Sequence, residues 1–307
     1  MSGIPKWHFA MLNDAERNRA FAEAINERVN NKHTVLDIGA GTGLLSVLAL
    51  ASGARSVDAF EADPDIARVA RQVLSTHGAR EVNLFAIHST RASLRTTARK
   101  NFLLTETFDC AVIGEGILPT LRHARRELLQ TAYDALPAEV SLSGRLISAP
   151  RLRALNEVSD AVGIKVDPMN RLQTVGHFPV RLHTWPHEFV SDAELLYRLD
   201  LHSEPDNTTG LNARFRADRS SYVDGVLAWF DMDLGAGAIL TNSPGTDSHW
   251  MQAFIPLPAP VYVDQGSEVD FKFRIVDDTK FVADHLGPSH HTAERRHPAL
   301  ATRIFQV

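Results

Sequence analysis

The sequence predicts an α/β domain with a mostly parallel sheet, followed by a second domain of antiparallel strands. In the first half, short apolar runs alternate with helical patterns, which is typical of a parallel sheet with helices on its faces. In the second half, apolar and polar residues alternate with a period of two between turn residues, which is typical of an antiparallel sheet or barrel. The pattern changes near residue 150, so we predict domains over residues 1–150 and 151–307.

Each element of the first domain follows from a local pattern. Residues 14–28 place apolar side chains on one stripe, which predicts an amphipathic helix. Residues 43–51 have helical character, and Asp63 and Pro64 can open a further helix because proline suits the first helical turn. Apolar runs of strand length predict strands at residues 34–39, 56–61, 83–87 and 101–105.

In the second domain, alternation predicts strands at residues 261–263 and 269–275, and residues 221–233 are strand-like. Turn residues at 243–246 and 264–266 separate these strands. The result is a sheet that continues through short turns, without the helical crossovers that a parallel arrangement requires.

Composition restricts the function. The 307 residues suggest about two domains, and 44% hydrophobic with 22% charged residues exclude global disorder. The 37 acidic and 32 basic side chains leave a net charge of −5, which argues against a nucleic-acid partner and is compatible with a cationic ligand. Cys110 is the single cysteine, so an internal disulfide and a multi-cysteine zinc site are excluded.

No targeting or membrane signal is recognisable. The first ten residues lack the basic start and apolar core of a secretory signal. The apolar stretch at residues 44–51 is far shorter than the ~20 residues that span a membrane. We expect a cytoplasmic chain, possibly also nuclear, with no membrane partner and no direct nucleic-acid partner.

A glycine-rich loop follows the first predicted strand. Residues 37–43 read Asp-Ile-Gly-Ala-Gly-Thr-Gly, and glycines there allow a tight turn and a close backbone approach to a ligand. A dinucleotide fingerprint would need glycine at position 44, which is Leu44. The loop instead resembles the form that S-adenosylmethionine-dependent methyltransferases use. The predicted cofactor contacts in this loop are Asp37, Gly39, Ala40 and Gly41.

Polar residues follow the next two strands. Glu61 ends the second strand, where a carboxylate can accept hydrogen bonds from both ribose hydroxyls. The alternative is an ordinary turn with a surface glutamate. Ser89 and Thr90 follow the third strand and are the candidate adenine contacts.

Three further segments carry a family resemblance. Residues 7–21, 105–119 and 243–252 resemble the N-terminal signature, the double-glutamate loop and the Thr-His-Trp loop of the protein arginine methyltransferases. With the glycine loop, they occur in the family's order over nearly the whole chain. The resemblance implies a Rossmann-like class I S-adenosylmethionine methyltransferase domain, followed by an antiparallel β-barrel domain with an inserted dimerisation arm at about residues 160–180.

The resemblance implies that Glu106 and Glu115 bind the substrate arginine and are catalytic. A guanidinium stays protonated up to a pH of about 12, and paired carboxylates can bind its planar fork. They would aim one nitrogen at the sulfonium methyl of S-adenosyl-L-methionine, leaving S-adenosyl-L-homocysteine. Such a transfer needs no metal, and we expect none. Without the motif, lone glutamates are more often solvated surface groups.

The other motifs imply further contacts. Arg17 matches the arginine that pairs with the cofactor carboxylate, and Met11 matches the methionine near the sulfonium. Phe9 is expected on the adenine or along the arginine tunnel, and Glu106 is expected to contact the cofactor as well. Each could otherwise be a helix-surface or core residue.

His249 and Trp250 match the last two positions of the Thr-His-Trp loop, with Ser248 in place of the threonine. The resemblance implies that His249 is catalytic and braces the N-terminal helix, and that Trp250 flanks the substrate. The alternative for His249 is a structural histidine. Ser89 and Thr90 stand where the family often has an acidic side chain.

Gly114 and Gly116 flank Glu115, which resembles the monomethylating, type III branch. The resemblance implies mainly omega-N-monomethylarginine as product, in Arg/Gly-rich proteins, histone tails or RNA-binding proteins, and a homodimer. A dimethylating relative and, in another class, an inactive protein-binding scaffold remain alternatives. A small-molecule methyltransferase is less favoured, because it would not need the paired glutamates, and a dehydrogenase is the remaining alternative.

Two charged segments are set aside. His290, His291 and His297 invite a metal-site interpretation, but no second cluster matches them, so a solvated loop is expected. The basic residues within 91–100 are interpreted as a surface loop.

Overall fold

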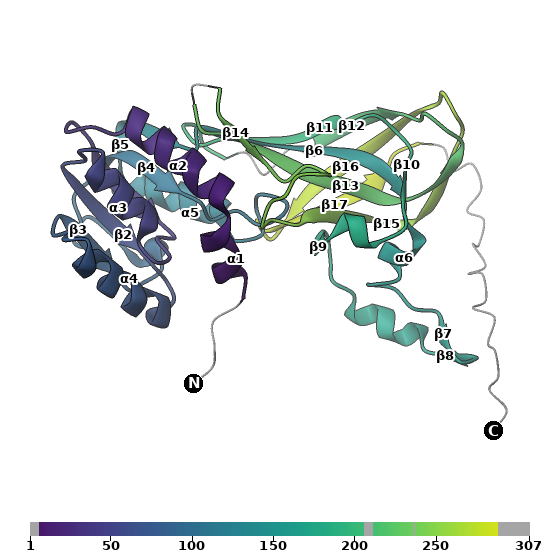
Figure 1. Ribbon diagram of the computed structural model, residues 1–307. Helices are drawn as coiled ribbons and strands as arrows, with labels where there is room; N and C mark the ends of the chain where they lie inside the picture. The colour runs from purple at the N-terminus through teal and green to yellow at the C-terminus, as the bar shows by residue number, and fades with distance from the viewer. Residues whose placement is uncertain (1–5, 206–210, 236, 288–307) are drawn as a thin grey trace.

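A computed structural model describes residues 6–205, 211–235 and 237–287. Figure 1 shows a sheet with helices at one side, antiparallel strands at the other, and α1 (Trp7–Asn13) beside the junction. The predicted fold class is confirmed. His290, His291 and His297 lie outside the described residues.

The first sheet has five parallel strands in the order β3-β2-β1-β4-β5. The strands are β1 (Thr34–Ile38), β2 (Ser56–Phe60), β3 (Val82–Phe85), β4 (Lys100–Thr105) and β5 (Leu129–Leu136). The first four confirm the sequence predictions with small differences at their ends. Because β1 lies between β2 and β4, the strand order reverses beside it.

Helices cover this sheet, and acidic caps begin two of them. Asp14 accepts the N–H of Arg17 at the start of α2, and Asp63 accepts two N–H groups at the start of α4. Phe21 and Ile25 of α2 are buried, as the predicted apolar stripe requires. The helices after α1 are α2 (Ala15–Arg28), α3 (Leu44–Ala51), α4 (Pro64–Thr76) and α5 (Ile117–His123), which continues as a π-helical turn over Ala124–Leu128.

The second half is built from antiparallel strands. A larger sheet centres on β6 (Glu139–Ser148), β13 (Ser221–Asp233) and β15 (Gln252–Val263). β9 (Phe178–Val180), β10 (Glu188–Phe189), β11 (Glu194–Asp200) and β14 (Ile239–Thr241) pair with it. A smaller sheet contains β12 (Leu211–Arg216), β16 (Glu268–Val276) and β17 (Lys280–His285). β15 contacts β17 and β11 contacts β12, so the two sheets close on each other like a barrel.

The chain changes sheets earlier than residue 150. β6 begins at Glu139 and pairs with β13 of the antiparallel sheet, whereas β5, which ends at Leu136, belongs to the parallel sheet. Burial alternates along β6, as expected for a strand with one face toward the core.

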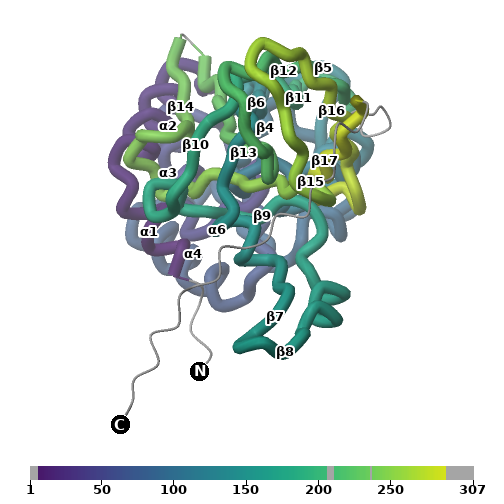
Figure 2. Tube along the Cα trace, turned by 90° about the vertical axis from the view of Figure 1, so that its right-hand side faces the viewer, coloured from purple at the N-terminus to yellow at the C-terminus, as the bar shows by residue number. Residues whose placement is uncertain are grey.

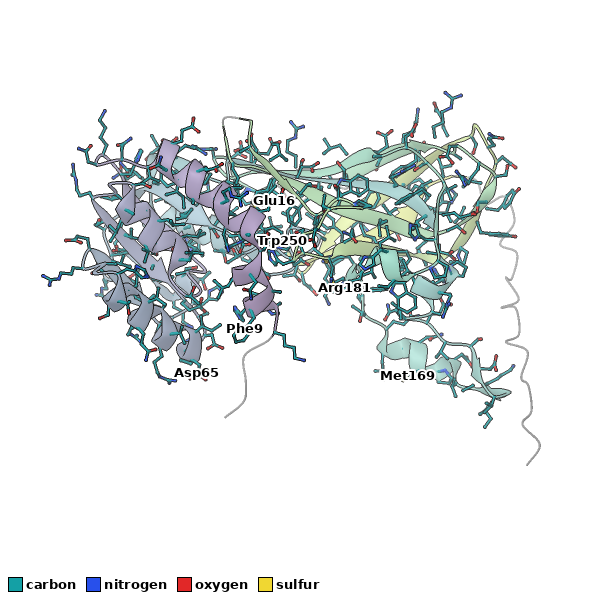
Figure 3. The ribbon with its side chains drawn as sticks, in the orientation of Figure 1. Phe9, Glu16, Asp65, Met169, Arg181 and Trp250 are labelled. Carbon is teal, nitrogen blue, oxygen red and sulfur yellow. The ribbon has the colours of Figure 1, made fainter. Side chains whose placement is uncertain are left out.

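A segment with an apolar surface projects from the barrel. It follows α6 (Pro150–Arg153) and contains β7 (Asp160–Ala161), β8 (Ile164–Lys165) and a 3₁₀ helix over Asp167–Leu172. Figure 2 shows β7 and β8 extending away from the body, and Figure 3 places Met169 on the same projection. It coincides with the predicted arm at residues 160–180. Among the described residues, no helix combines the length and the apolar character needed to cross a membrane.

Candidate active site

A cavity of about 600 Å³ opens at the carboxyl edge of the parallel sheet, beside α1 and the barrel. Ligands of such sheets bind at this edge, where the strand order reverses. The loops after β1, β2, β3 and β4 all contribute to its wall. The sequence-predicted residues that line it are Met11, Gly39, Gly41, Glu61, Ser89, Glu106, Glu115, His249 and Trp250.

The glycine loop after β1 has a backbone that other residues would strain. Gly39 has φ 74° and Gly41 has φ 54°. A Cβ atom at Gly39 would lie 2.1 Å from Cγ2 of Thr107, so the loop has no room for a side chain there. The N–H groups of Gly39 and Ala40 each donate to the carbonyl oxygen of Phe60 at 3.0 Å, which ties the loop to the end of β2.

Glu61 is buried beside this loop. Its Oε2 accepts the N–H of Gly41 at 2.9 Å, and its Oε1 accepts the N–H of Asp63 at 2.8 Å. A carboxylate has about four lone-pair sites, so both oxygens can accept further hydrogen bonds. The position therefore has acceptor capacity left for a diol, and contact with a cofactor ribose stays a prediction.

Asp37 lies beneath the loop and does not line the cavity. Its Oδ2 accepts the hydroxyl of Ser46 at 2.5 Å. Burial raises the pKa of Asp37 to about 7, with a further rise from Glu61, although the Ser46 hydrogen bond opposes the shift. This geometry supports the loop from behind, and Ala40 is also buried away from the cavity wall.

Arg17 and Glu106 form a buried ion pair, of which only Glu106 lines the cavity. Nε of Arg17 lies 3.1 Å from Oε1 of Glu106, with side chains 4% and 9% exposed. Nη1 of Arg17 donates to Oδ1 of Asn18 at 2.8 Å. A guanidinium has five N–H donors, so donors remain for a carboxylate ligand.

Glu115 supplies a second carboxylate to the same cavity. It lies in the loop before α5 and lines the cavity, with part of the residue accessible to solvent. Desolvation is the largest cause that raises the pKa of Glu115 to about 7, followed by the negative charges of Glu106, Asp109 and Glu61. Repulsion among these carboxylates favours a cation in the cavity.

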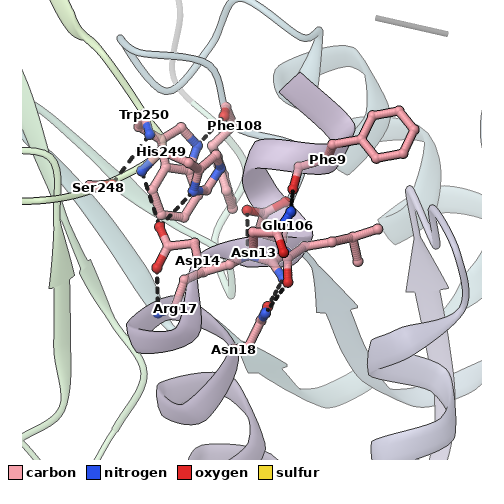
Figure 4. A network of polar contacts seen from close by, with 11 residues as sticks. Phe9, Asn13, Asp14, Arg17, Asn18, Glu106, Phe108, Ser248, His249 and Trp250 are labelled. Atoms are coloured by element: carbon pink, nitrogen blue, oxygen red, sulfur yellow. Dashed lines mark hydrogen bonds and ion pairs between the residues drawn. The ribbon is translucent and has the colours of Figure 1, made fainter. Parts of the chain in front are cut away.

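A polar network joins the N-terminal helices to the barrel (Figure 4). Oδ2 of Asp14 accepts both Nδ1 and the backbone N–H of His249, at 2.9 and 3.1 Å. Trp250 donates its indole N–H to the carbonyl oxygen of Phe108 at 3.1 Å, and its backbone N–H to Oγ of Ser248 at 3.3 Å. Ser248 therefore provides a hydroxyl acceptor at the position of the expected threonine.

Phe9 and Thr90 lie off the cavity wall, as do Arg17, Asp37 and Ala40. The side chain of Phe9 is 59% exposed and extends away from the network (Figure 4), and Thr90 hydrogen-bonds His88 at 2.8 Å. Trp7 and His8 line the cavity instead, with rings stacked 3.6 Å apart. Burial lowers the pKa of His8. The helical spacing of α1 could have indicated that residues 7, 8 and 11 share a face.

Three further residues that line the cavity could not be predicted from local sequence patterns. Thr107, Asp109 and Pro179 line the cavity beside the predicted residues. Pro179 belongs to β9 of the barrel, so the cavity wall combines both halves of the chain. Only the tertiary fold brings it there.

Comparisons with known proteins agree with this architecture. Residues 151–284 match the family model described as arginine methyltransferase oligomerization subdomain, and residues 20–109 match ribosomal protein L11 methyltransferase (PrmA). A solved Trypanosoma brucei PRMT1 enzyme-prozyme heterotetrameric complex with AdoHcy has a TM-score of 0.77 at 19% identity, over 92% of this chain and 96% of that chain, which shows the fold.

Proteins with similar sequences identify the family, whereas the structural neighbour shows only the fold. Protein arginine N-methyltransferase 7 of Danio rerio is 28% identical over 84% of this chain and 43% of that protein, so this chain spans less than half of that relative. The arginine N(omega)-methyltransferase of Streptomyces achromogenes subsp. streptozoticus is 40% identical over 90% of this chain and 78% of that protein. On this similarity, the chain belongs to the protein arginine methyltransferase family.

Proposed function

We propose that this protein transfers one methyl group from S-adenosyl-L-methionine to a terminal guanidinium nitrogen of arginine, giving mainly omega-N-monomethylarginine. The observation that carries the proposal is the pair of carboxylates, Glu106 and Glu115, in one cavity with the glycine loop. The family membership supports arginine methylation, and the finer assignment to monomethylation is ours.

The cofactor position follows from the residues along the carboxyl edge of the sheet. Glu61 would hold the ribose hydroxyls, and Arg17 would pair with the cofactor carboxylate through its remaining donors. Met11 and Ser89 would pack nearby as cavity-lining groups. When bound, S-adenosylmethionine supplies a sulfonium-activated methyl group. The protein's contribution is orientation and exclusion of water.

The arginine position follows from charge. Glu106 and Glu115 would bind the guanidinium as two charge-assisted acceptors, and Arg17 holds Glu106 in place. A bound cation would favour the ionised form of Glu115, whose pKa is otherwise raised to about 7. His249 would brace the helices through Asp14, and Trp250 would form one side of the pocket.

Monomethylation is favoured by the loop around Glu115. Gly114 and Gly116 flank it, and relatives from Danio rerio and Gallus gallus that are 28% and 29% identical are named protein arginine N-methyltransferase 7. A dimethylating enzyme is the alternative within the family, and an inactive scaffold is the alternative in another class. We also propose that the chain forms a homodimer through the projecting arm.

Free arginine is a second candidate substrate. The 40% identical Streptomyces relative is named for arginine without the word protein. Two carboxylates recognise a guanidinium equally well on a free amino acid and on a peptide, because only the planar fork is contacted. The paired glutamates therefore do not distinguish these two substrates.

One experiment separates the candidates. The protein is incubated with methyl-labelled S-adenosylmethionine and, in parallel, with an Arg/Gly-rich peptide, a histone-tail peptide or free L-arginine, and the products are resolved by mass. We expect omega-N-monomethylarginine as the main product. Dimethylarginine as a major product would contradict monomethylation. If only free L-arginine were methylated, the substrate would be free arginine and not arginine in proteins.

The Glu115→Gln variant tests the site itself, because glutamine keeps the size of the side chain and removes its charge. We expect methyl transfer to fall by about 100-fold or more, while cofactor binding changes little. Cofactor binding by the wild-type protein without transfer to any of the three substrates would favour the scaffold.

A further inference from the structure

Several hydrogen bonds join the loop that carries both glutamates to the barrel, among them those that Trp250 donates to Phe108 and Asn242 donates to Cys110. Oδ2 of Asp109, which lies between Glu106 and Glu115 in the sequence, accepts a hydrogen bond from Nε2 of His177 at 2.8 Å. His177 lies just before β9, and its side chain is 4% exposed. The contact therefore links the cofactor domain to the barrel through a buried imidazole.

The second ring nitrogen determines what His177 can do. Nδ1 accepts the backbone N–H of Phe281 in β17 at 3.1 Å, so this nitrogen carries no proton. The neutral ring then bears its proton on Nε2, which makes His177 a donor to Asp109. Asp109, Cys110 and His177 lie close enough to suggest a metal site, but a protonated Nε2 cannot be a metal ligand.

Asp109 in turn holds the backbone next to Glu115. Its Oδ1 accepts the backbone N–H of Gly114 at 2.8 Å and that of Ala111 at 3.2 Å. A Cβ atom at position 114 would lie 2.1 Å from Oδ2 of Asp109, so the carboxylate occupies the space that a side chain would need. Gly114 is thus required for the close approach of Asp109, and it directly precedes Glu115.

Gly116, on the other side of Glu115, has φ 79° and open space around it. Its role is conformational, because it begins α5 in the left-handed region. The two glycines therefore serve different purposes. One accommodates the Asp109 carboxylate, and the other allows the backbone turn.

We propose that His177 is a positioning residue for Glu115, acting through Asp109 and the amide of Gly114. The inference rests on the proposed function, since it assigns Glu115 to the substrate arginine. Without the His177 donor, the Asp109 carboxylate can rotate and release the Gly114 amide. Glu115 then samples orientations in which it does not contact the guanidinium. The glycine loop and Glu61 keep their positions, so the cofactor site is unchanged.

Two variants test this. His177→Phe keeps a ring but removes the donor to Asp109, and Asp109→Asn places an amide N–H opposite the Nε2–H of His177 while its carbonyl oxygen can still accept from Gly114. Each is expected to raise the KM for the arginine substrate about tenfold, with the Kd for S-adenosylmethionine within about twofold of wild type. His177→Gln, whose amide can donate to Asp109, is expected to restore most of the lost KM.

His285→Phe is the matched control, because His285 is a partly buried barrel histidine whose described contact is with Phe271 rather than the loop. It should leave both constants unchanged. A merely structural role of His177 would lower the active fraction and leave KM unaltered, which would overturn the inference. If His177→Phe does not fold, Asp109→Asn carries the test, and an unchanged KM there has the same consequence. Absence of transfer by the wild-type protein would instead refute the proposed function.

Discussion

Asp14 and His249 are 235 residues apart in sequence, yet Oδ2 of Asp14 lies 2.9 Å from Nδ1 of His249. The other oxygen of the same carboxylate accepts the N–H of Arg17 at 2.9 Å and caps α2. Burial alone would raise the pKa of Asp14, but hydrogen bonds from Arg17 and His249 hold it below its usual range. One side chain therefore begins the helix that carries Arg17 and attaches that helix to the barrel.

Replacing Asp14 by alanine should destabilise the protein more than the loss of a helix cap alone. A lost cap costs about 1 kcal/mol, and leaving the buried His249 donors unpaired adds about 1–3 kcal/mol. Asp63→Ala, which removes the cap of α4, is the control for the first contribution. Urea unfolding measures both variants. Equal losses would mean that the contact with His249 contributes nothing.

That stabilisation should depend on pH in a definite direction. Because the pKa of Asp14 is lowered on folding, its contribution is present above its unfolded value of 3.8 and is lost as the pH falls through the folded value. The gap in unfolding free energy between wild type and Asp14→Ala should therefore close in strong acid. A gap that stayed constant down to pH 2 would contradict this assignment.

Glu115 should behave in the opposite way. Its pKa is raised from 4.5 to about 7, so between these values the folded protein binds more protons than the unfolded chain, and stability falls as the pH rises. Glu115→Gln removes this penalty. Allowing for solvent screening, we expect the variant to be more stable than wild type by about 1 kcal/mol at pH 8, or about 2 °C in Tm. At pH 4 the two should unfold together, and a gain there would show that charge is not the cause.

The glycine loop gives a prediction for cofactor binding. An alanine at Gly39 would meet Cγ2 of Thr107 and adopt φ 74°, so the loop must shift and its amides lose their positions. Gly78→Ala is the control, because it has φ 63° and open space outside the site. Saturating S-adenosylmethionine at about 100 Kd should add about 2.7 kcal/mol to wild type and to Gly78→Ala, and much less to Gly39→Ala. A full thermal shift for Gly39→Ala would refute the steric argument.

Local sequence patterns predicted most of the cofactor side. The strand before the glycine loop, the strand ending at Glu61 and the helix begun by Asp63 each depend on neighbouring residues, so short-range chemistry specifies them. Asp37 shows the limit of such patterns. The motif marks it as part of the loop, but its buried place against Ser46, rather than on the cavity wall, depends on packing.

The contacts that join the two domains could not be predicted in this way. His177 stands alone in its segment, and nothing nearby in sequence indicates that Asp109 and the amide of Phe281 will satisfy both of its ring nitrogens. Asp14 was identifiable as a helix cap from its place before α2, but its second partner comes from the opposite end of the fold. Long-range pairs of this kind appear only when two sheets are placed side by side.

The projecting arm carries exposed apolar side chains. Leu172 is 77% exposed and Met169 is 61% exposed, close to Val162 and Ile164 in the same segment. Apolar side chains gathered on one projection are typical of a surface that a partner covers, and the match to an oligomerization subdomain supports a second copy as that partner.

Leu172→Glu would place a charge in the contact, where burial without a counter-ion is costly. We expect the wild type to have the mass of a dimer by light scattering, and Leu172→Glu to have the mass of a monomer with an unchanged circular dichroism spectrum. Leu94→Glu, at a leucine that is 56% exposed away from the arm, should remain dimeric. A monomeric wild type, or dimers in all three proteins, would show that this surface is not the interface.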